Sequence, residues 1–407
     1  MRIVVQKFGG SSVADNEKRN RVIDRIIECK NRGMNVVVVL SAMGRAPQPY
    51  ATDSLINLIC KDPQKTVCLR DKDLLMSCGE IISCVVLAQM LRDRGHDAVS
   101  ITGWQAGFIT DGDYSEARIL HINPERICTE LENGKIPIVT GFQGISPDGE
   151  ITTLGRGGSD TTATALGVAL DAEEVEIYTD VDGVMTCNPR VLKDPRTIKE
   201  LHYLEAGEMS GQGAKVLHKR CIAPAARLNI PLWVKEYSSG KRGTRICQEI
   251  EKEAFERRRI VTSVVDIPDM AHIAVDLIDA KDRSLSRLEL LRTFEKANIS
   301  LDLINVVREK LYFIVREEEV MRVVGLCKDF DLPVQIIHGC AKISCVGIGM
   351  KGTPGVMAAI QEALASAGVN ILHATDSHIT ISLLIKQRDL RQAVDALADK
   401  FSLREKD

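Results

Sequence analysis

The chain has 407 residues, of which 44% are hydrophobic and 27% are charged, and its formal net charge is −3. These values are typical of a globular protein of two or three domains. The charge gives no electrostatic footprint for nucleic acid or a membrane surface, and an aromatic content of 4% leaves few side chains on which bases could stack.

The 12 cysteines stand singly, mostly in apolar segments, and none forms a Cys-x-x-Cys pair. This pattern predicts reduced, buried thiols in a cytoplasmic protein. We expect no signal peptide, because a charge and a strand begin the chain at once, and the longest uninterrupted apolar runs are too short to cross a bilayer. The sequence therefore predicts a cytoplasmic location, with no membrane and no nucleic-acid partner.

Residues 1–245 alternate predicted strands with predicted helices. The strands are Val- and Ile-rich runs such as RIVVQKF and NVVVVLSAMG, and amphipathic segments such as EKRNRVIDRIIECKNRG lie between them. Continuous apolar runs of this kind predict an α/β domain with a largely parallel sheet between helix layers. Because parallel strands end at one edge of a sheet, we expect binding residues in the loops at that edge.

The rest of the chain contains a repeat. After a charged connecting segment at 246–265, the sequence aligns with itself without a gap at an offset of 70 residues, so that LYFIVREEEV lies on ISLLIKQRDL. Each copy, 266–335 and 336–407, predicts the order strand, helix, strand, strand, helix. Such a unit is an α+β domain with a small antiparallel sheet and helices on one face.

The second copy also matches the dinucleotide pattern G-x-G-x-x-G at Gly347, Gly349 and Gly352. The first copy has no glycine at the equivalent positions, and the predicted order of elements provides no parallel crossover. A single match is weak evidence, and we interpret these glycines as a turn into a helix.

Lys7 and a glycine pair follow the first predicted strand, in KFGGSSV. A P-loop has its lysine after the glycines, so this segment is not one. Consecutive backbone N–H groups and a lysine still suit a phosphate, although a plain tight turn is an alternative of equal weight.

The segment TTLGRGGSDTTATALG, residues 152–167, is a stronger motif. Asp160 stands near a predicted helix start, where it could serve as an N-cap. A cap does not require the neighbouring Arg156, Gly157, Gly158 and Ser159, whereas a fixed cation with exposed backbone donors suits an anion. Two further loops, YTDVDGVMTCNPR at 178–190 and GQGAKVLH at 211–218, bring polar residues to the same predicted edge.

Taken together, KFGGSSV, SAMG, LLMSCGEIIS, TTLGRGGSDTTA, YTDVDGVMT and GAKVLH resemble the aspartate kinases, which combine the amino acid kinase fold with C-terminal tandem ACT domains. The resemblance covers essentially the whole chain, and AMGRAPQPYATDSL and ATDSHITI are similar to the monofunctional subgroup regulated by diaminopimelate. It implies conversion of ATP and L-aspartate to ADP and 4-phospho-L-aspartate with Mg²⁺. In this family that reaction is the first committed step toward lysine, threonine and methionine.

The resemblance also implies a role for each matching residue. Lys7, Asp160 and Lys215 would be catalytic, with Asp160 orienting the two lysines. Aspartate would bind to Ser41, Thr52, Glu80 and Arg156. The nucleotide would bind to Lys7, Phe8, Gly9, Gly10, Ser11, Gly157, Gly158, Ser159, Thr179, Asp180, Met185, Arg190, Lys215 and Val216. No residue is assigned as a metal ligand.

Regulation is implied by the two ACT copies. An amino-acid effector, which is diaminopimelate, lysine or threonine, would bind near Asp302, Asn305, Met350, Thr353 and Gly355. ACT sheets tend to pair between chains, so we expect a homodimer or homotetramer.

Three positions depart from the family pattern. Asn188 replaces an aspartate in TCNPR, Lys219 replaces a proline after KVLH, and the Pro-Gly turn is missing from the first ACT copy at 279–285. The changes at Asn188 and Lys219 keep a rival hypothesis open, namely a sensor without turnover. The other rival is a kinase of the same fold that acts on glutamate, N-acetylglutamate or a nucleotide.

Overall fold

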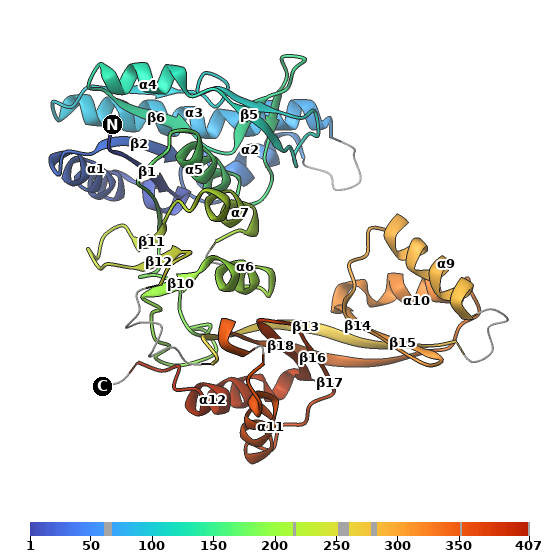
Figure 1. The fold of residues 1–407 in the computed structure, drawn as a ribbon. Coiled ribbons are helices and arrows are strands. Elements are labelled where there is room, and N and C mark those ends of the chain that lie inside the picture. The colour runs from blue at the N-terminus through green and yellow to red at the C-terminus, as the bar shows by residue number, and fades with distance from the viewer. Residues whose placement is uncertain (61–66, 215–216, 251–259, 278–282, 351, 406–407) are drawn as a thin grey trace. The chain divides into compact units, whose positions relative to one another are not determined.

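The computed structural model describes residues 1–60, 67–214, 217–250, 260–277, 283–350 and 352–405 (Figure 1). They divide into two compact units. The N-terminal unit comprises the described residues of 1–184, 197–211 and 215–255, and the C-terminal unit comprises those of 185–196, 212–214 and 256–407. Residues 185–196 and 212–214, which the sequence places in the N-terminal domain, pack with the C-terminal unit.

An eight-stranded sheet forms the centre of the N-terminal unit. Its strands are β1 (Ile3–Phe8), β2 (Asn35–Leu40), β3 (Ala98–Ile101), β6 (Ile136–Thr140), β9 (Glu174–Thr179), β10 (Glu200–His202), β11 (Leu232–Glu236) and β12 (Thr244–Cys247). They lie in the order β10-β12-β11-β9-β1-β2-β6-β3, and every pair except β11–β12 is parallel. The largely parallel sheet predicted from the apolar runs is thus confirmed.

Helices cover this sheet. They are α1 (Asn16–Asn31), α2 (Thr52–Ile59), α3 (Leu69–Asp93), α4 (Glu125–Glu132), α5 (Gly158–Ala169), α6 (Tyr203–Gly211) and α7 (Lys219–Leu228), with a short 3-10 turn η1 (Gly10–Val13) after β1. Side chains of α1 and α3 pack against β1, β2 and β6 in one buried cluster.

Lys219 is the first residue of α7, a position where proline and other residues are tolerated alike, so this departure leaves the helix intact.

A second, four-stranded sheet adjoins the first in the same unit. It contains β4 (Phe108–Thr110), β5 (Ile119–Ile122), β7 (Gln143–Ile145) and β8 (Ile151–Thr153), in the order β5-β4-β7-β8. The buried carboxylate of Asp73 on α3 accepts hydrogen bonds from Ser115 and from the Thr153 backbone, at 2.7–2.8 Å. This contact fixes α3 against the small sheet.

Helix α3 is long and apolar enough to cross a membrane, judged by length and composition alone. Its uninterrupted apolar runs are shorter than a bilayer span, because charged residues such as Glu80 interrupt them. Half of its apolar window is buried inside the N-terminal unit, and its face there carries the buried carboxyl groups of Asp73 and Glu80. Burial of this kind is typical of a helix in a protein core.

The C-terminal unit has a six-stranded antiparallel sheet in the order β14-β15-β13-β16-β18-β17. Its strands are β13 (Ser263–Asp276), β14 (Asp302–Val307), β15 (Lys310–Arg316), β16 (Val334–Val346), β17 (His373–Asp376) and β18 (Thr380–Lys386). Its helices are α9 (Arg283–Lys296), α10 (Val320–Lys328), α11 (Val356–Ser366) and α12 (Leu390–Lys400), with 3-10 turns η2 (Glu317–Glu319), η3 (Ile348–Met350) and η4 (Gln387–Asp389).

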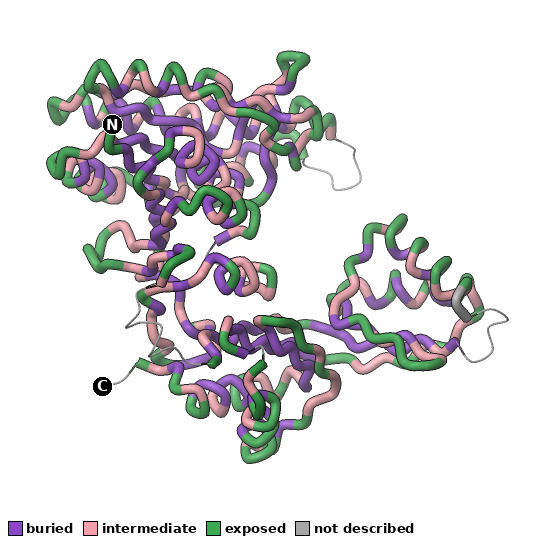
Figure 2. The backbone as a smooth tube through the Cα atoms, in the orientation of Figure 1, coloured by how far each residue is buried: buried purple, intermediate pink, exposed green. Residues whose placement is uncertain are grey.

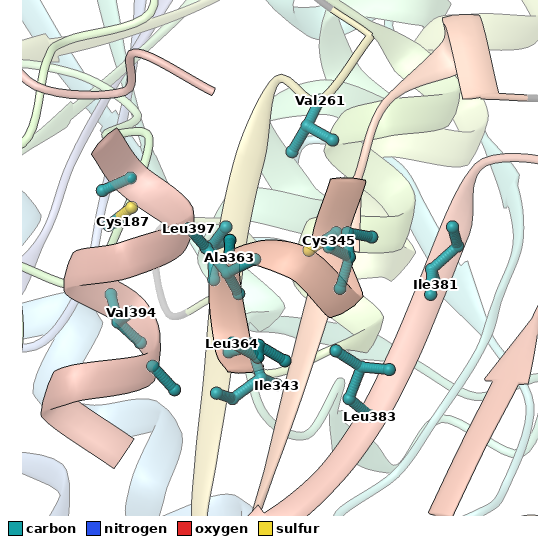
Figure 3. Close-up of a cluster of buried hydrophobic side chains, with 14 of the residues drawn as sticks. Cys187, Val261, Ile343, Cys345, Ala363, Leu364, Ile381, Leu383, Val394 and Leu397 are labelled. Atoms are coloured by element: carbon teal, nitrogen blue, oxygen red, sulfur yellow. The ribbon is translucent and has the colours of Figure 1, made fainter. Parts of the chain in front are cut away.

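These elements confirm the repeat. Strand β15 and turn η2 recur as β18 and η4 at the expected offset of 70 residues, and each copy has the predicted order of elements. Alternate strand residues face the helices of their own copy and form two separate cores. Figure 3 shows the core of the second copy, where Ile343, Cys345 and Leu383 of the sheet meet Leu364 and Leu397 of the helices.

The two copies share strands. Residues 263–267 of β13 pair with 342–346 of β16, while residues 272–275 of β13 pair with 334–337 of β16. The predicted boundary between 335 and 336 therefore falls inside β16. An alignment of the two copies cannot show that one strand continues from the first copy into the second.

Candidate active site

Two loops interlock at the ends of β1 and β2. The Gly44 N–H donates to the Gly10 carbonyl at 2.9 Å, and the Ser41 N–H donates to the Phe8 carbonyl at 3.2 Å. A Cβ atom on Gly10 would lie 2.4 Å from the Ala42 carbonyl oxygen, so this position requires glycine. KFGG and SAMG thus form one structural element, and the plain tight turn considered above does not describe it.

Lys7 and Asp160 form an ion pair between β1 and α5. The Lys7 Nζ lies 2.6 Å from Asp160 Oδ1, and the two side chains are 12% and 16% exposed. The N-cap of α5 is Gly157, with φ of +70°, and Asp160 lies one turn inside the helix. The N-cap interpretation of Asp160 is therefore wrong, and its carboxylate is oriented toward the lysine instead.

Two pockets meet at this ion pair. The Arg156 pocket is lined by Lys7, Ser41, Thr52, Glu80, Phe142, Gly155, Arg156, Gly157, Gly158, Ser159 and Asp160. The Asp180 pocket is lined by Lys7, Gly9, Gly10, Ser11, Ser41, Gly44, Arg45, Asp160, Ile177, Tyr178, Thr179 and Asp180. Lys7, Ser41 and Asp160 line both pockets. Each pocket has a volume of about 250 Å³.

The Arg156 pocket contains a cation and a buried acid. Glu80 on α3 is 2% exposed, and burial raises its pKa to about 8. One oxygen of its carboxyl group accepts from the Ala42 N–H at 3.1 Å, and the other has no hydrogen-bond partner among the described residues. Arg156 is exposed and forms no ion pair with the described residues. The pocket can therefore receive a molecule that carries both an ammonium and a carboxylate group.

The Asp180 pocket has a different chemistry. Gly9, Gly10 and Ser11 bring backbone groups to its wall at the start of η1, and the Thr179 hydroxyl donates to the Asp180 carboxylate at 3.1 Å. Exposed backbone N–H groups, Lys7 and a carboxylate at one site suit a phosphate chain with its metal ion. No group of three or more His, Cys, Asp or Glu side chains that could hold a metal occurs among the described residues.

Some predicted site residues line neither pocket. Phe8 is fully buried and stacks on Tyr178, with ring centroids 4.6 Å apart. Lys215 and Val216 lie outside the described residues. Met185 and Arg190 belong to the C-terminal unit, so their assignment to the nucleotide stays a prediction.

Asn188, the departure in TCNPR, has a structural role in the C-terminal unit. Its side-chain oxygen accepts from the Arg190 N–H at 3.1 Å, and its amide nitrogen donates to Asp266 at 3.3 Å. The side chain thus closes a turn, which either aspartate or asparagine can do.

Several lining residues have no predicted role in the site. They are Gly44, Arg45, Ile177 and Tyr178 in the Asp180 pocket, and Phe142 and Gly155 in the Arg156 pocket. Arg45 stands within AMGRAPQPYATDSL, which carries the resemblance to the subgroup, but that resemblance assigns it no site role. Phe142 and Ile177 carry no polar signal that a sequence pattern could reveal.

The predicted effector residues occupy two parts of the C-terminal unit. Asp302 and Asn305 lie on β14, and the Asp302 carboxylate pairs with the Lys342 ammonium from β16. Met350 is buried, the Thr353 hydroxyl donates to the Gly349 carbonyl at 2.6 Å, and Gly355 is the N-cap of α11. Most of the altered turn of the first copy lies outside the described residues, and effector binding stays a prediction.

Known proteins match this chain in sequence and in structure. The amino acid kinase family profile matches residues 2–236, and an ACT domain profile matches residues 335–399. Aspartokinase 1 of Bacillus subtilis (strain 168) is 39% identical over 408 residues, which cover 99% of this chain and 100% of that protein. Aspartokinase III of E. coli, crystallised with aspartate and ADP, superposes with a TM-score of 0.78 at 25% identity and covers 98% of this chain and 100% of that one.

The fold and the paired pockets define a phosphotransferase of the amino acid kinase type with a carboxyl group as acceptor. The chain belongs to the aspartokinase family, whose members it matches over its whole length. The family resemblance inferred from the motifs is thereby confirmed.

Proposed function

We propose that the chain transfers the terminal phosphoryl group of ATP to the β-carboxylate of L-aspartate, giving ADP and 4-phospho-L-aspartate. The supporting observation is the Lys7–Asp160 pair, which lies where the Arg156 pocket meets the Asp180 pocket. A group bound in one pocket can react with a group bound in the other only at this junction. E. coli aspartokinase III was crystallised with aspartate and ADP.

The Arg156 pocket suits aspartate as the acceptor. The Arg156 guanidinium pairs with one substrate carboxylate, and the free oxygen of Glu80 accepts from the α-ammonium group. Ser41, whose hydroxyl donates to Ser159 at 2.9 Å, and Thr52 offer further hydroxyl groups. The attacking β-carboxylate is ionised at neutral pH, since its usual pKa is about 4, so the reaction needs no general base.

The Asp180 pocket suits the nucleotide. Gly9, Gly10 and Ser11 donate from the backbone, and Gly157, Gly158 and Ser159 line the acceptor side of the junction. Lys7 reduces the repulsion between the incoming carboxylate and the phosphate charge, and Asp160 holds the lysine in place. We assign Lys215 the corresponding role from the resemblance alone.

Mg²⁺ fits the Asp180 pocket as a companion of the phosphates. It prefers oxygen ligands and commonly binds through one or two carboxylates together with substrate phosphates, and Asp180 with Thr179 offers such oxygens. The ion would neutralise charge on the phosphate chain.

We further propose feedback regulation of a cytoplasmic enzyme through the ACT pair. E. coli aspartokinase III was also crystallised with lysine and aspartate. By analogy an amino acid, which is diaminopimelate, lysine or threonine, shifts the population toward a less active state, and the chain assembles as a homodimer or homotetramer through its ACT sheets. The product would enter lysine, threonine and methionine synthesis.

Trapping of the product with hydroxylamine tests the proposal. Incubation with Mg-ATP, hydroxylamine and aspartate is expected to give the aspartyl hydroxamate, while glutamate and N-acetylglutamate give none. A hydroxamate from glutamate but not from aspartate would refute the assignment of the acceptor. Wild-type protein that binds ATP but forms no acyl phosphate from any acceptor would favour the sensor.

A further inference from the structure

The loop from Ser41 to Thr52 passes both pockets. It begins after β2 at Ser41, which lines both pockets. Gly44 and Arg45, in its middle, line the Asp180 pocket, and Thr52 at its end lines the Arg156 pocket. The loop therefore begins where the two pockets meet, lines the Asp180 pocket in its middle and ends at the Arg156 pocket.

The backbone of Arg45 is held in position. Gly44 is bonded to Gly10 on one side, and on the other the Arg45 N–H donates to the Gln48 side-chain oxygen at 3.1 Å. The Gln48 N–H donates back to the Arg45 carbonyl at 2.9 Å. Gly44 has φ of +80°, and a Cβ atom there would overlap the Gln48 side chain. The loop thus presents Arg45 from a fixed turn that is bonded to the glycine pair.

The charges in the Asp180 pocket leave Arg45 available for an anion. Lys7 is paired with Asp160, and Asp180 is bonded to Thr179. The Arg45 side chain is exposed and pairs with no carboxylate in the described part of the chain. Among the described residues that line this pocket, Arg45 is the one cation not already paired with an acid.

We propose that Arg45 is a catalytic residue that contacts the terminal phosphoryl group of ATP during its transfer. This inference rests on the proposed function. In the transfer, a β-carboxylate oxygen of aspartate forms a bond to the γ-phosphorus while the bond from that phosphorus to the bridging oxygen breaks, and ADP leaves with the electron pair. No proton moves, and charge spreads over the oxygens of the transferred group. A guanidinium stays charged throughout and can bind two of these oxygens at once.

Steady-state kinetics and nucleotide binding of three variants test this proposal. Arg45→Ala is expected to lower kcat about a hundredfold. This loss is smaller than the losses known for arginines that complete buried phosphoryl-transfer sites, because Arg45 is exposed. The kcat of Arg45→Lys is expected to lie between those of wild type and Arg45→Ala, since lysine retains the charge but not the paired donors. Arg21→Ala, which removes an exposed arginine paired with Glu17 on α1, is the matched control and is expected to keep wild-type kcat.

The proposal also specifies which phosphate is bound. Arg45→Ala is expected to weaken binding of a non-hydrolysable ATP analogue at least fivefold and to leave ADP binding within twofold of wild type. Added guanidinium chloride is expected to restore part of kcat in Arg45→Ala but not in Arg21→Ala.

Provided that wild-type protein makes the aspartyl hydroxamate, three results would overturn the proposal. They are a kcat for Arg45→Ala within twofold of wild type, an equal loss of ADP and ATP-analogue binding, or a change confined to the aspartate KM. Failure of the proposed function itself would appear differently, as wild-type protein that forms no acyl phosphate from aspartate.

Discussion

The two units contain ion pairs of the same composition in contrasting surroundings. In the N-terminal unit, Lys7 and Asp160 are similarly accessible, at 12% and 16% exposed, and both line two pockets. In the C-terminal unit, the Lys342 side chain is 4% exposed, whereas its partner Asp302 is 44% exposed. Ligands can reach and rearrange the first pair, whereas the second joins β14 to β16 and depends on one half-exposed carboxylate.

Figure 2 shows burial along the backbone: β1 is almost entirely buried, whereas β16 is buried only in its second half, 340–346. A Lys–Asp pair that lines two pockets is a candidate for turnover, whereas the pair between β14 and β16 is expected to stabilise its sheet and includes a predicted effector residue, Asp302. The following experiments separate the two roles.

Lys7→Met has the largest expected effect on turnover. Removing the ammonium leaves the phosphate charge uncompensated at the junction, and kcat is expected to fall about a thousandfold. Thermal unfolding is expected to change little. Lys241→Met is the control, since Lys241 pairs with Asp182 at 2.7 Å but is largely exposed. If Lys7→Met lowers the unfolding temperature but not kcat, Lys7 stabilises the fold, as we expect of Lys342, and has no role in turnover.

Asp302→Asn has the largest expected effect on stability. It leaves the Lys342 ammonium buried without its acid, which is expected to destabilise the C-terminal unit by about 2 kcal/mol. The midpoint of thermal unfolding would fall by about 4–8 °C. The double variant Asp302→Asn with Lys342→Met is expected to recover most of the loss. If the double variant unfolds at a lower temperature than Asp302→Asn alone, the loss of stability does not come from an unpaired Lys342 ammonium.

Arg156→Lys tests recognition of the acceptor. Lysine keeps the charge but loses the paired donors, so the KM for aspartate is expected to rise about tenfold with a smaller change in the KM for ATP. Arg2→Lys, at an exposed pair with Glu173 outside both pockets, is the control. Equal changes in both KM values would argue against a role confined to aspartate.

Glu80 predicts a pH dependence. Burial raises its pKa to about 8, so the free enzyme carries a neutral carboxyl group below that pH and cannot attract the α-ammonium. The value of kcat/KM for aspartate is therefore expected to decline as pH falls below about 8, while kcat at saturation changes less because the bound ammonium favours the ionised form. Glu80→Gln is expected to remove this inflection. A wild-type profile that is flat from pH 6 to 9 would contradict the assignment.

Much of the architecture was predictable because it depends on local patterns. Val- and Ile-rich runs identified the central strands, and the offset of 70 residues identified the repeated elements down to the turns η2 and η4. The small sheet was not recognised, since its strands have three or four residues and ITTLG reads equally well as part of the main sheet.

The candidate site was predicted in part. Motifs on separate loops indicated both pockets, and Ser41, Thr52, Glu80 and Arg156 do line one of them. The sequence could not show that Asp160 lies inside its helix rather than at the cap, because that depends on where α5 begins. Nor could it show that Phe8 turns into the core, because a residue at a strand end can face either side.

The continuity of β13 and β16 through both ACT copies limits how this chain can be re-engineered. A chimaera joined between 335 and 336 would cut β16 after its second residue and separate the rest of that strand from its partner residues of β13. Exchange of regulatory modules between relatives should therefore take both copies together, along with residues 185–196 and 212–214 that pack with them. Calorimetry of such a transplant is expected to show the two copies melting in a single cooperative transition.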